Sequence, residues 1–136
     1  MRKVIIILIL FFGCELIYSQ NIISLVHSPT DMGLGLRYDR QIGDYGPYIT
    51  ASKGKYRIEQ DIRHEKLSVG VSRYMSNYST AVFSAGLVYN HYHNDINNVH
   101  PYSLEFGGGG VIGKAFIGFL FDPLNWEGAF CVGLKF

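Results

Sequence analysis

The chain has 136 residues, which suffice for one domain and are too few for two. Its net charge of +1, from 12 basic and 11 acidic residues, excludes the strongly basic surface of a typical nucleic-acid-binding protein. Charged residues make up only 17% of the sequence, below the ~25% usual for soluble domains, so we do not expect the whole exterior to face water.

Residues 1–19 have the features of a secretory signal peptide. Arg2 and Lys3 form a basic start, an apolar run follows as far as Phe12, and Ser19 supplies a small residue near a cleavage point. The apolar run is too short for the ~20 residues of a membrane-spanning helix. We therefore expect export and cleavage after Ser19.

The two cysteines bear on both the signal and the mature domain. Gly13 and Cys14 leave open a lipoprotein signal, in which Cys14 would be lipidated. Otherwise Cys14 leaves with the signal, and the mature domain over 20–136 keeps only Cys131. A single cysteine forms no internal disulfide, so hydrogen-bonded strands must hold the domain together.

Beyond residue 20 the apolar residues recur with a period of two, which indicates β-strands. Clusters of Gly, Pro, Asn, Asp and Ser separate these stretches and are typical of turns. The pattern predicts eight strands, over 22–28, 32–42, 47–58, 64–75, 80–92, 101–112, 114–121 and 125–136. Short connections between consecutive strands favour an all-β fold, an antiparallel up-and-down β-barrel.

One face of these strands carries large apolar side chains. The set is Met32, Leu34, Leu36, Leu67, Val69, Val71, Phe83, Leu87, Phe130, Val132 and Leu134. Too many large side chains lie on this face to fit inside eight strands, and tyrosines near the strand ends are typical of membrane-interface girdles. Closure into a barrel would also remove sheet edges that aggregate. We therefore expect this face to contact lipid.

The opposite face is rich in Gly, Ser and Ala, which suits a narrow interior. Its charged residues are Arg37, Asp39, Glu105, Lys114, Glu127 and Lys135. Because a lone buried ion is costly, we expect these three basic and three acidic groups to pair in one network. Such a network predicts a plugged interior without an open pore, and a proton or ion pathway along it is the alternative.

The connections should divide between the two membrane sides. Transmembrane barrels have short periplasmic turns and longer outer loops. With both termini on the periplasmic side, the third and fifth connections face outward, and these are the longer predicted ones, 59–63 and 93–100.

The Gly-x-Gly-rich strands and the final Gly133-Leu134-Lys135-Phe136 resemble small outer-membrane β-barrel proteins of Gram-negative bacteria, especially of the Bacteroidetes type. The resemblance covers the mature chain at the level of pattern and brings no catalytic motif. It implies an outer-membrane location, contact with lipid and passage through the barrel-assembly machinery. It also implies that Phe136 is the assembly signal.

Two sets of residues are weak candidates, one for a metal site and one for a catalytic site. His91 and His93 share a strand face and are metal-ligand types, although His-x-His alone is a weak signal. Ser84 or Ser103 with His91 could act on lipid, but no third group orients the histidine. A run of glycines over 107–110 lacks the Lys-Ser/Thr of a phosphate loop and predicts a flexible or bulged strand.

We expect a small outer-membrane barrel with a structural or surface-interaction role, no cofactor and no nucleic-acid partner. Its surface ligand is not indicated by the sequence. Two alternatives stay open: a membrane-embedded enzyme acting on lipid or lipopolysaccharide, and a soluble periplasmic or secreted barrel that binds an apolar ligand.

Overall fold

The computed structural model describes residues 20–30, 32–56, 62–76, 80–93 and 99–136. The predicted signal peptide and most of the two longer predicted loops lie outside these residues. The strands are β1 (Gln20–Ser28), β2 (Gly33–Gln41), β3 (Tyr45–Tyr56), β4 (Ile62–Ser76), β5 (Thr80–Tyr92), β6 (Tyr102–Ile112), β7 (Ala115–Asp122) and β8 (Glu127–Lys135). All eight predicted strands are present, with ends shifted by two residues at most.

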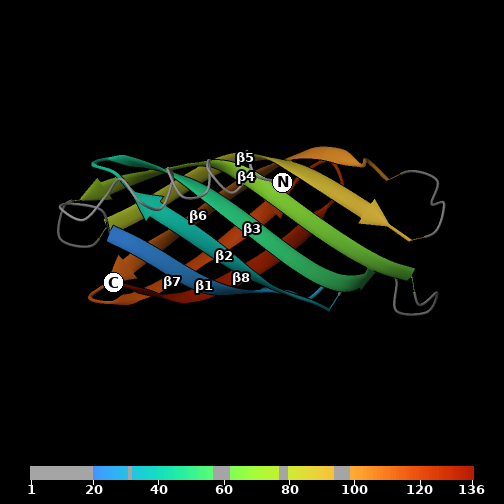
Figure 1. Ribbon diagram of the computed structural model, residues 1–136, viewed down its shortest axis with the longest axis horizontal. Helices are drawn as coiled ribbons and strands as arrows, with labels where there is room; N and C mark the ends of the chain where they lie inside the picture. Colours follow the sequence, from blue (N-terminus) through green and yellow to red (C-terminus); the bar gives the residue numbers. More distant parts are fainter. Residues whose placement is uncertain (1–19, 31, 57–61, 77–79, 94–98) are drawn as a thin grey trace, which may run out of the picture.

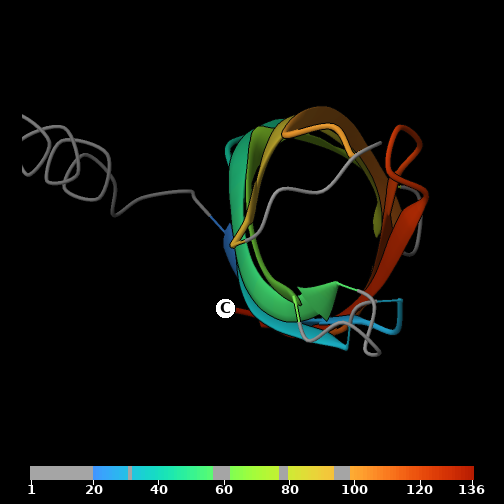
Figure 2. The ribbon, with the colours of Figure 1, turned by 90° about the vertical axis from the view of Figure 1, so that its right-hand side faces the viewer.

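The strands close into one antiparallel barrel in chain order (Figure 1). β1 pairs with β8 from Ile22↔Lys135 to His27↔Phe130, and the view along the barrel shows the resulting ring (Figure 2). The predicted all-β, up-and-down architecture is therefore confirmed. The described residues contain no helix of the length and hydrophobicity needed to cross a membrane.

The barrel has two different ends. The end that holds Gln20 and Phe136, here the terminal end, carries the short connections 42–44, 77–79 and 113–114. The opposite loop end carries 29–32, 57–61, 93–101 and 123–126, and so has the longer connections, as predicted. Gly43 and Gly113 have φ of 64° and 62° in the tight turns, a conformation that glycine adopts without strain.

The strand alternation sorts side chains between the outside and the inside of the barrel. The apolar residues predicted to face outward do so, with exposed fractions between 44% and 67%. We call this outward set, with its apolar neighbours such as Ile49, Leu104, Phe106, Ile117 and Phe119, the apolar belt. The side chains on the inward face of the same strands are mostly buried. The barrel therefore has an apolar outer surface, and its inward side chains pack against one another.

A small apolar cluster occupies part of the interior, largely toward the terminal end. Its members are Ile22, Val26, Tyr74, Val82, Val111, Phe116, Leu120 and Cys131. The glycine run over 107–110 lies within β6, so the strand predicted there is present, and it pairs without interruption with β5 and β7, so the alternative of a bulge is wrong. Gly109 and Gly118 instead leave space for the Phe116 ring, which a Cβ at either position would crowd.

Candidate functional site: the interior network and the outer surface

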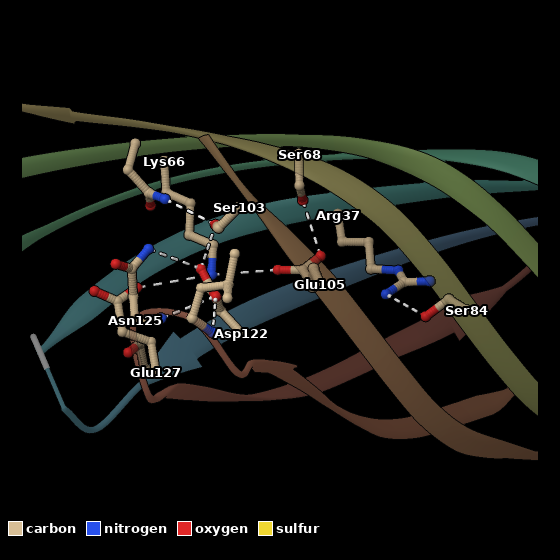
Figure 3. A network of polar contacts seen from close by, with 12 residues as sticks. Arg37, Lys66, Ser68, Ser84, Ser103, Glu105, Asp122, Asn125 and Glu127 are labelled. Carbon is tan, nitrogen blue, oxygen red and sulfur yellow. Dashed lines mark hydrogen bonds and ion pairs between the residues drawn. The ribbon is translucent and has the colours of Figure 1, made fainter. Parts of the chain in front are cut away.

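A bidentate ion pair lies deep inside the barrel. Arg37 donates from Nε and Nη2 to the two carboxylate oxygens of Asp39, each at 2.7 Å, and both side chains are at most 2% exposed. Ser72 donates to Asp39 at 2.7 Å, and Arg37 reaches Ser84 at 3.4 Å (Figure 3). The pair is thus hydrogen-bonded on both sides, as a buried ion pair needs.

Tyr48 connects this pair to the next carboxylate. The Arg37 guanidinium carbon lies 4.1 Å from the Tyr48 ring centre, a cation–π distance, and the Tyr48 hydroxyl donates to Glu105 at 3.3 Å. Gly70 and Gly86 lie beneath the ring, where a Cβ would collide with it. These two glycines are therefore required by the ring's position across the barrel.

Glu105 and Glu127 share the second interior cation, Lys66. The ammonium lies 3.3 Å from Glu105 and 3.8 Å from Glu127. Ser68 also donates to Glu105, at 2.9 Å, and His64 Nδ1 lies 3.9 Å from Glu127. The hydroxyls of Ser68 and Tyr48 supply further hydrogen bonds to Glu105. The Lys66 ammonium can therefore lie between the two carboxylates and interact with both.

Asp122 ends the network at the loop end. It accepts hydrogen bonds from the backbone N–H groups of Leu124 and Asn125 at 3.0 and 3.1 Å and from Ser103. Asn125 in turn accepts from the backbone N–H of His100 at 2.9 Å and donates to its carbonyl at 3.1 Å. Residues 123–126 therefore form a turn that hydrogen bonds hold against the connection between β5 and β6.

The predicted charge set is partly wrong. The structure brings Arg37, Asp39, Glu105 and Glu127 into the interior, but Lys114 is exposed in the turn between β6 and β7. Lys135 is half-buried at the terminal end and forms no ion pair with another described residue. Both lysines lie outside the network because they occupy a turn and a strand end.

Sequence reasoning missed Lys66, His64 and Asp122 as interior groups. The first two share their strand parity with Ser68 and Ser72, which the alternation already placed inward. This shared parity could have predicted that Lys66 and His64 point into the barrel. Asp122 was assigned to a turn, whereas it ends β7 with its side chain buried.

A small cavity lies beside this network among the described residues. It is lined by Thr50, Lys66, Glu105, Leu120 and Glu127, among others, and has a volume of about 10 Å³ open to the centre of a water molecule. That is room for one water at most.

The weak catalytic candidates are separated by the sheet. Ser84 and Ser103 are buried inside the barrel, whereas His91 is exposed on its outside. Ser84 and His91 differ in strand parity, so their side chains leave β5 on opposite faces. The structure does not bring either serine together with His91.

The weak metal candidates, His91 and His93, do lie together. Their ring centres are 4.8 Å apart, and His93 Nε2 is 3.7 Å from Glu65. Among the residues that the structure describes, no group of three or more His, Cys, Asp or Glu side chains is arranged to hold a metal ion.

An eight-stranded closed barrel with an apolar outside and a polar inside has the fold of transmembrane β-barrels. In agreement, the backbone aligns with that of the Yersinia pestis outer membrane protein Ail in a phospholipid bilayer nanodisc. The TM-score is 0.57 at 14% identity, and the alignment covers 88% of this chain and 99% of Ail. The likeness therefore concerns the fold.

Two further structures align less well. A crystal structure of the same Yersinia pestis protein gives a TM-score of 0.47 at 16% identity over 87% of this chain and 97% of that one. A de novo designed transmembrane β-barrel gives 0.44 at 14% identity over 87% and 92%. No family model and no curated protein matches the sequence.

Proposed function

We propose that the protein is a small outer-membrane β-barrel with a structural or surface-interaction role, exported by a signal peptide over 1–19. The observation that carries the proposal is the apolar belt, which exposes large side chains around the barrel. Soluble monomers rarely expose apolar patches beyond a few hundred Å², whereas lipid covers such a surface without penalty.

The height of the belt supports a bilayer. On β4 the outward residues Val71, Val69 and Leu67 lie between Arg73 toward the terminal end and Glu65 toward the loop end. About eight residue steps of ~3.3 Å, tilted by ~40°, place these charges about 20 Å apart along the barrel axis. This approaches the apolar band of about 25 Å in known barrels.

The two alternative functions find less support. A soluble barrel that binds an apolar ligand would keep its apolar face inside, yet the interior here contains Arg37, Asp39, Lys66, Glu105 and Glu127. A lipid-modifying enzyme built on the serines and His91 would need these groups on one face of the sheet.

The interior also supports the absence of an open pore. The polar chain from Arg37 through Tyr48 and Glu105 to Lys66 crosses the barrel, and the cavity beside it admits one water at most. A hydrated ion needs a wider path. These contacts support the proposed plugged interior.

Phe136 is the proposed assembly signal at the end of β8. It is exposed on the outside and exchanges two backbone hydrogen bonds of 2.9 Å with Asn21 at the closing seam. An apolar aromatic at this seam is accessible to the assembly machinery before β1 and β8 pair.

Fractionation of a Gram-negative host tests the proposal. We expect the mature protein in the outer-membrane fraction, resistant to carbonate extraction, with a gel mobility that changes on heating because a closed barrel resists detergent unfolding. Recovery in the soluble periplasmic fraction would contradict the membrane assignment. Reconstituted vesicles should retain a small trapped dye, and leakage proportional to the inserted protein would contradict the plugged interior.

A further inference from the structure

The hydroxyls of Ser24 and Thr50 lie inside the barrel and have no hydrogen-bond partner among the described residues. Both side chains are at most 2% exposed. They flank one residue, because the register pairs Arg37 with Ser24 on β1 and with Thr50 on β3. On the next strand, β4, the buried hydroxyls of Ser68 and Ser72 donate to carboxylates instead. Burying a hydroxyl without a partner is unfavourable, so Ser24 and Thr50 differ from their neighbours in a way that needs a physical reason.

A water-sized cavity adjoins one of these two hydroxyls. Thr50 lines the cavity of about 10 Å³ beside the interior network, whereas Ser24 does not. That volume, open to the centre of a water molecule, is about the space that one water occupies. The wall also carries three charged side chains, those of Lys66, Glu105 and Glu127. A buried water needs about two to four polar partners, and Thr50 with these three groups can supply them.

The contacts of Lys66 at this cavity are long for direct hydrogen bonds. Its ammonium lies 3.3 Å from Glu105 and 3.8 Å from Glu127. The other interior ion pair, between Arg37 and Asp39, measures 2.7 Å and matches the ~2.7–2.9 Å of a direct charge-assisted bond. A separation beyond about 3.5 Å is long enough for a bridging water. The Lys66–Glu127 distance therefore indicates a site for a water as well, independently of Thr50.

We propose that this cavity binds one ordered water molecule. The water accepts hydrogen bonds from the Lys66 ammonium and the Thr50 hydroxyl, and it donates to Glu127, so that it bridges the 3.8 Å ion pair. Its second proton is directed toward Glu105. A metal cation fits the same cavity less well, because the Lys66 ammonium is part of the wall. The site lies inside the barrel, so it does not depend on what surrounds the apolar belt.

A crystal structure of the unmodified barrel, at a resolution that shows ordered waters, tests the site directly. We expect one peak of water density within about 2.5–3.2 Å of both Thr50 Oγ1 and Lys66 Nζ. A cavity without such a peak would overturn the proposal. A peak that contacts Lys66 but not Thr50 would overturn the role of the hydroxyl.

The Thr50→Val variant tests the role of the hydroxyl in solution, because valine has nearly the shape of threonine without the oxygen. If Thr50 binds the water, the variant loses a hydrogen bond, and the equilibrium constant for unfolding should rise about fivefold. If the hydroxyl had no partner, its removal would leave this constant unchanged or lower it. The measurement is urea unfolding in lipid vesicles, and either of the latter two results would contradict the proposal.

Two further variants are matched controls. Ser24→Ala removes the other hydroxyl without a partner, which flanks the same arginine but does not line the cavity, so the unfolding constant should not rise. Thr50→Ser keeps the hydroxyl, and its crystal structure should retain the water peak that Thr50→Val loses. A rise with Ser24→Ala as large as that with Thr50→Val, or a water peak unchanged in Thr50→Val, would show that the Thr50 hydroxyl does not hold a water.

Discussion

Replacing Asp39 with alanine is expected to destabilise the folded barrel by about 3–5 kcal/mol, because the Arg37 charge would stay buried without its carboxylate. Asp39 accepts two hydrogen bonds from Arg37 and one from Ser72, all at 2.7 Å. The measurement is urea unfolding of the protein in lipid vesicles, followed by the change in gel mobility.

Two variants serve as controls for this prediction. Asp44→Ala removes an exposed aspartate from the turn between β2 and β3 and should change the unfolding free energy by about 0.5 kcal/mol or less. The combined Arg37→Met and Asp39→Leu variant removes both charges of this pair, so neither is left buried without its partner, and it should be more stable than Asp39→Ala. An Asp39→Ala barrel within about 1 kcal/mol of the unmodified protein would contradict the role of the pair.

Replacing Val69 with arginine should destabilise the barrel in lipid by about 2–4 kcal/mol. Val69 lies in the middle of the apolar belt, 48% exposed and paired with Ile49 and Leu87. An arginine there must enter the hydrocarbon, where its cost is largest at mid-depth. The measurement is the same unfolding experiment in vesicles.

The matched control is Tyr102→Arg, at an exposed position near the loop end. Close to the interface the cost of arginine falls to about 0–1 kcal/mol. If Val69→Arg and Tyr102→Arg had equal effects, depth in a bilayer would not explain the result. Such an outcome would favour a belt that faces water, where surface substitutions matter little.

The strands and their faces were predictable because alternation is a local property of the sequence. In β4, for example, Leu67, Val69 and Val71 alternate with Ser68, Gly70 and Ser72, and no tertiary information is needed to separate the two sets. Strand number followed from the turn residues between such stretches. Which of the two faces points outward was predictable from side-chain size, because the large apolar side chains are too many to fit inside eight strands.

The composition of the interior network was harder to predict because it depends on positions at strand ends. A predicted strand beginning at residue 114 placed Lys114 on the inward face, whereas β7 begins at Ala115 and Lys114 lies in the turn. Lys66 had the right parity, but nothing local indicates that its ammonium reaches Glu105 and Glu127. Those contacts arise from the closed barrel.

The structure also changes the charge balance that the sequence suggested. Among the described residues, the interior network contains four carboxylates, those of Asp39, Glu105, Asp122 and Glu127, and two permanent cations, Arg37 and Lys66. A further basic side chain, that of Arg40, is also buried. Neutral donors make up the difference, since hydroxyl and backbone N–H groups bind Glu105 and Asp122. Counting opposite charges along a sequence cannot find these neutral partners.

Lipid contact of the apolar belt is the claim on which the account depends, and fluorescence quenching by brominated lipids tests it most directly. Trp126 is the single tryptophan, so a Trp126→Phe barrel with Leu87→Trp reports on the middle of the belt. Bromines deep in the acyl chains should quench this tryptophan strongly, while those near the headgroups should quench Trp126 in the unmodified protein. A tryptophan at position 87 that is unaffected by brominated chains and quenched by aqueous iodide would contradict the account.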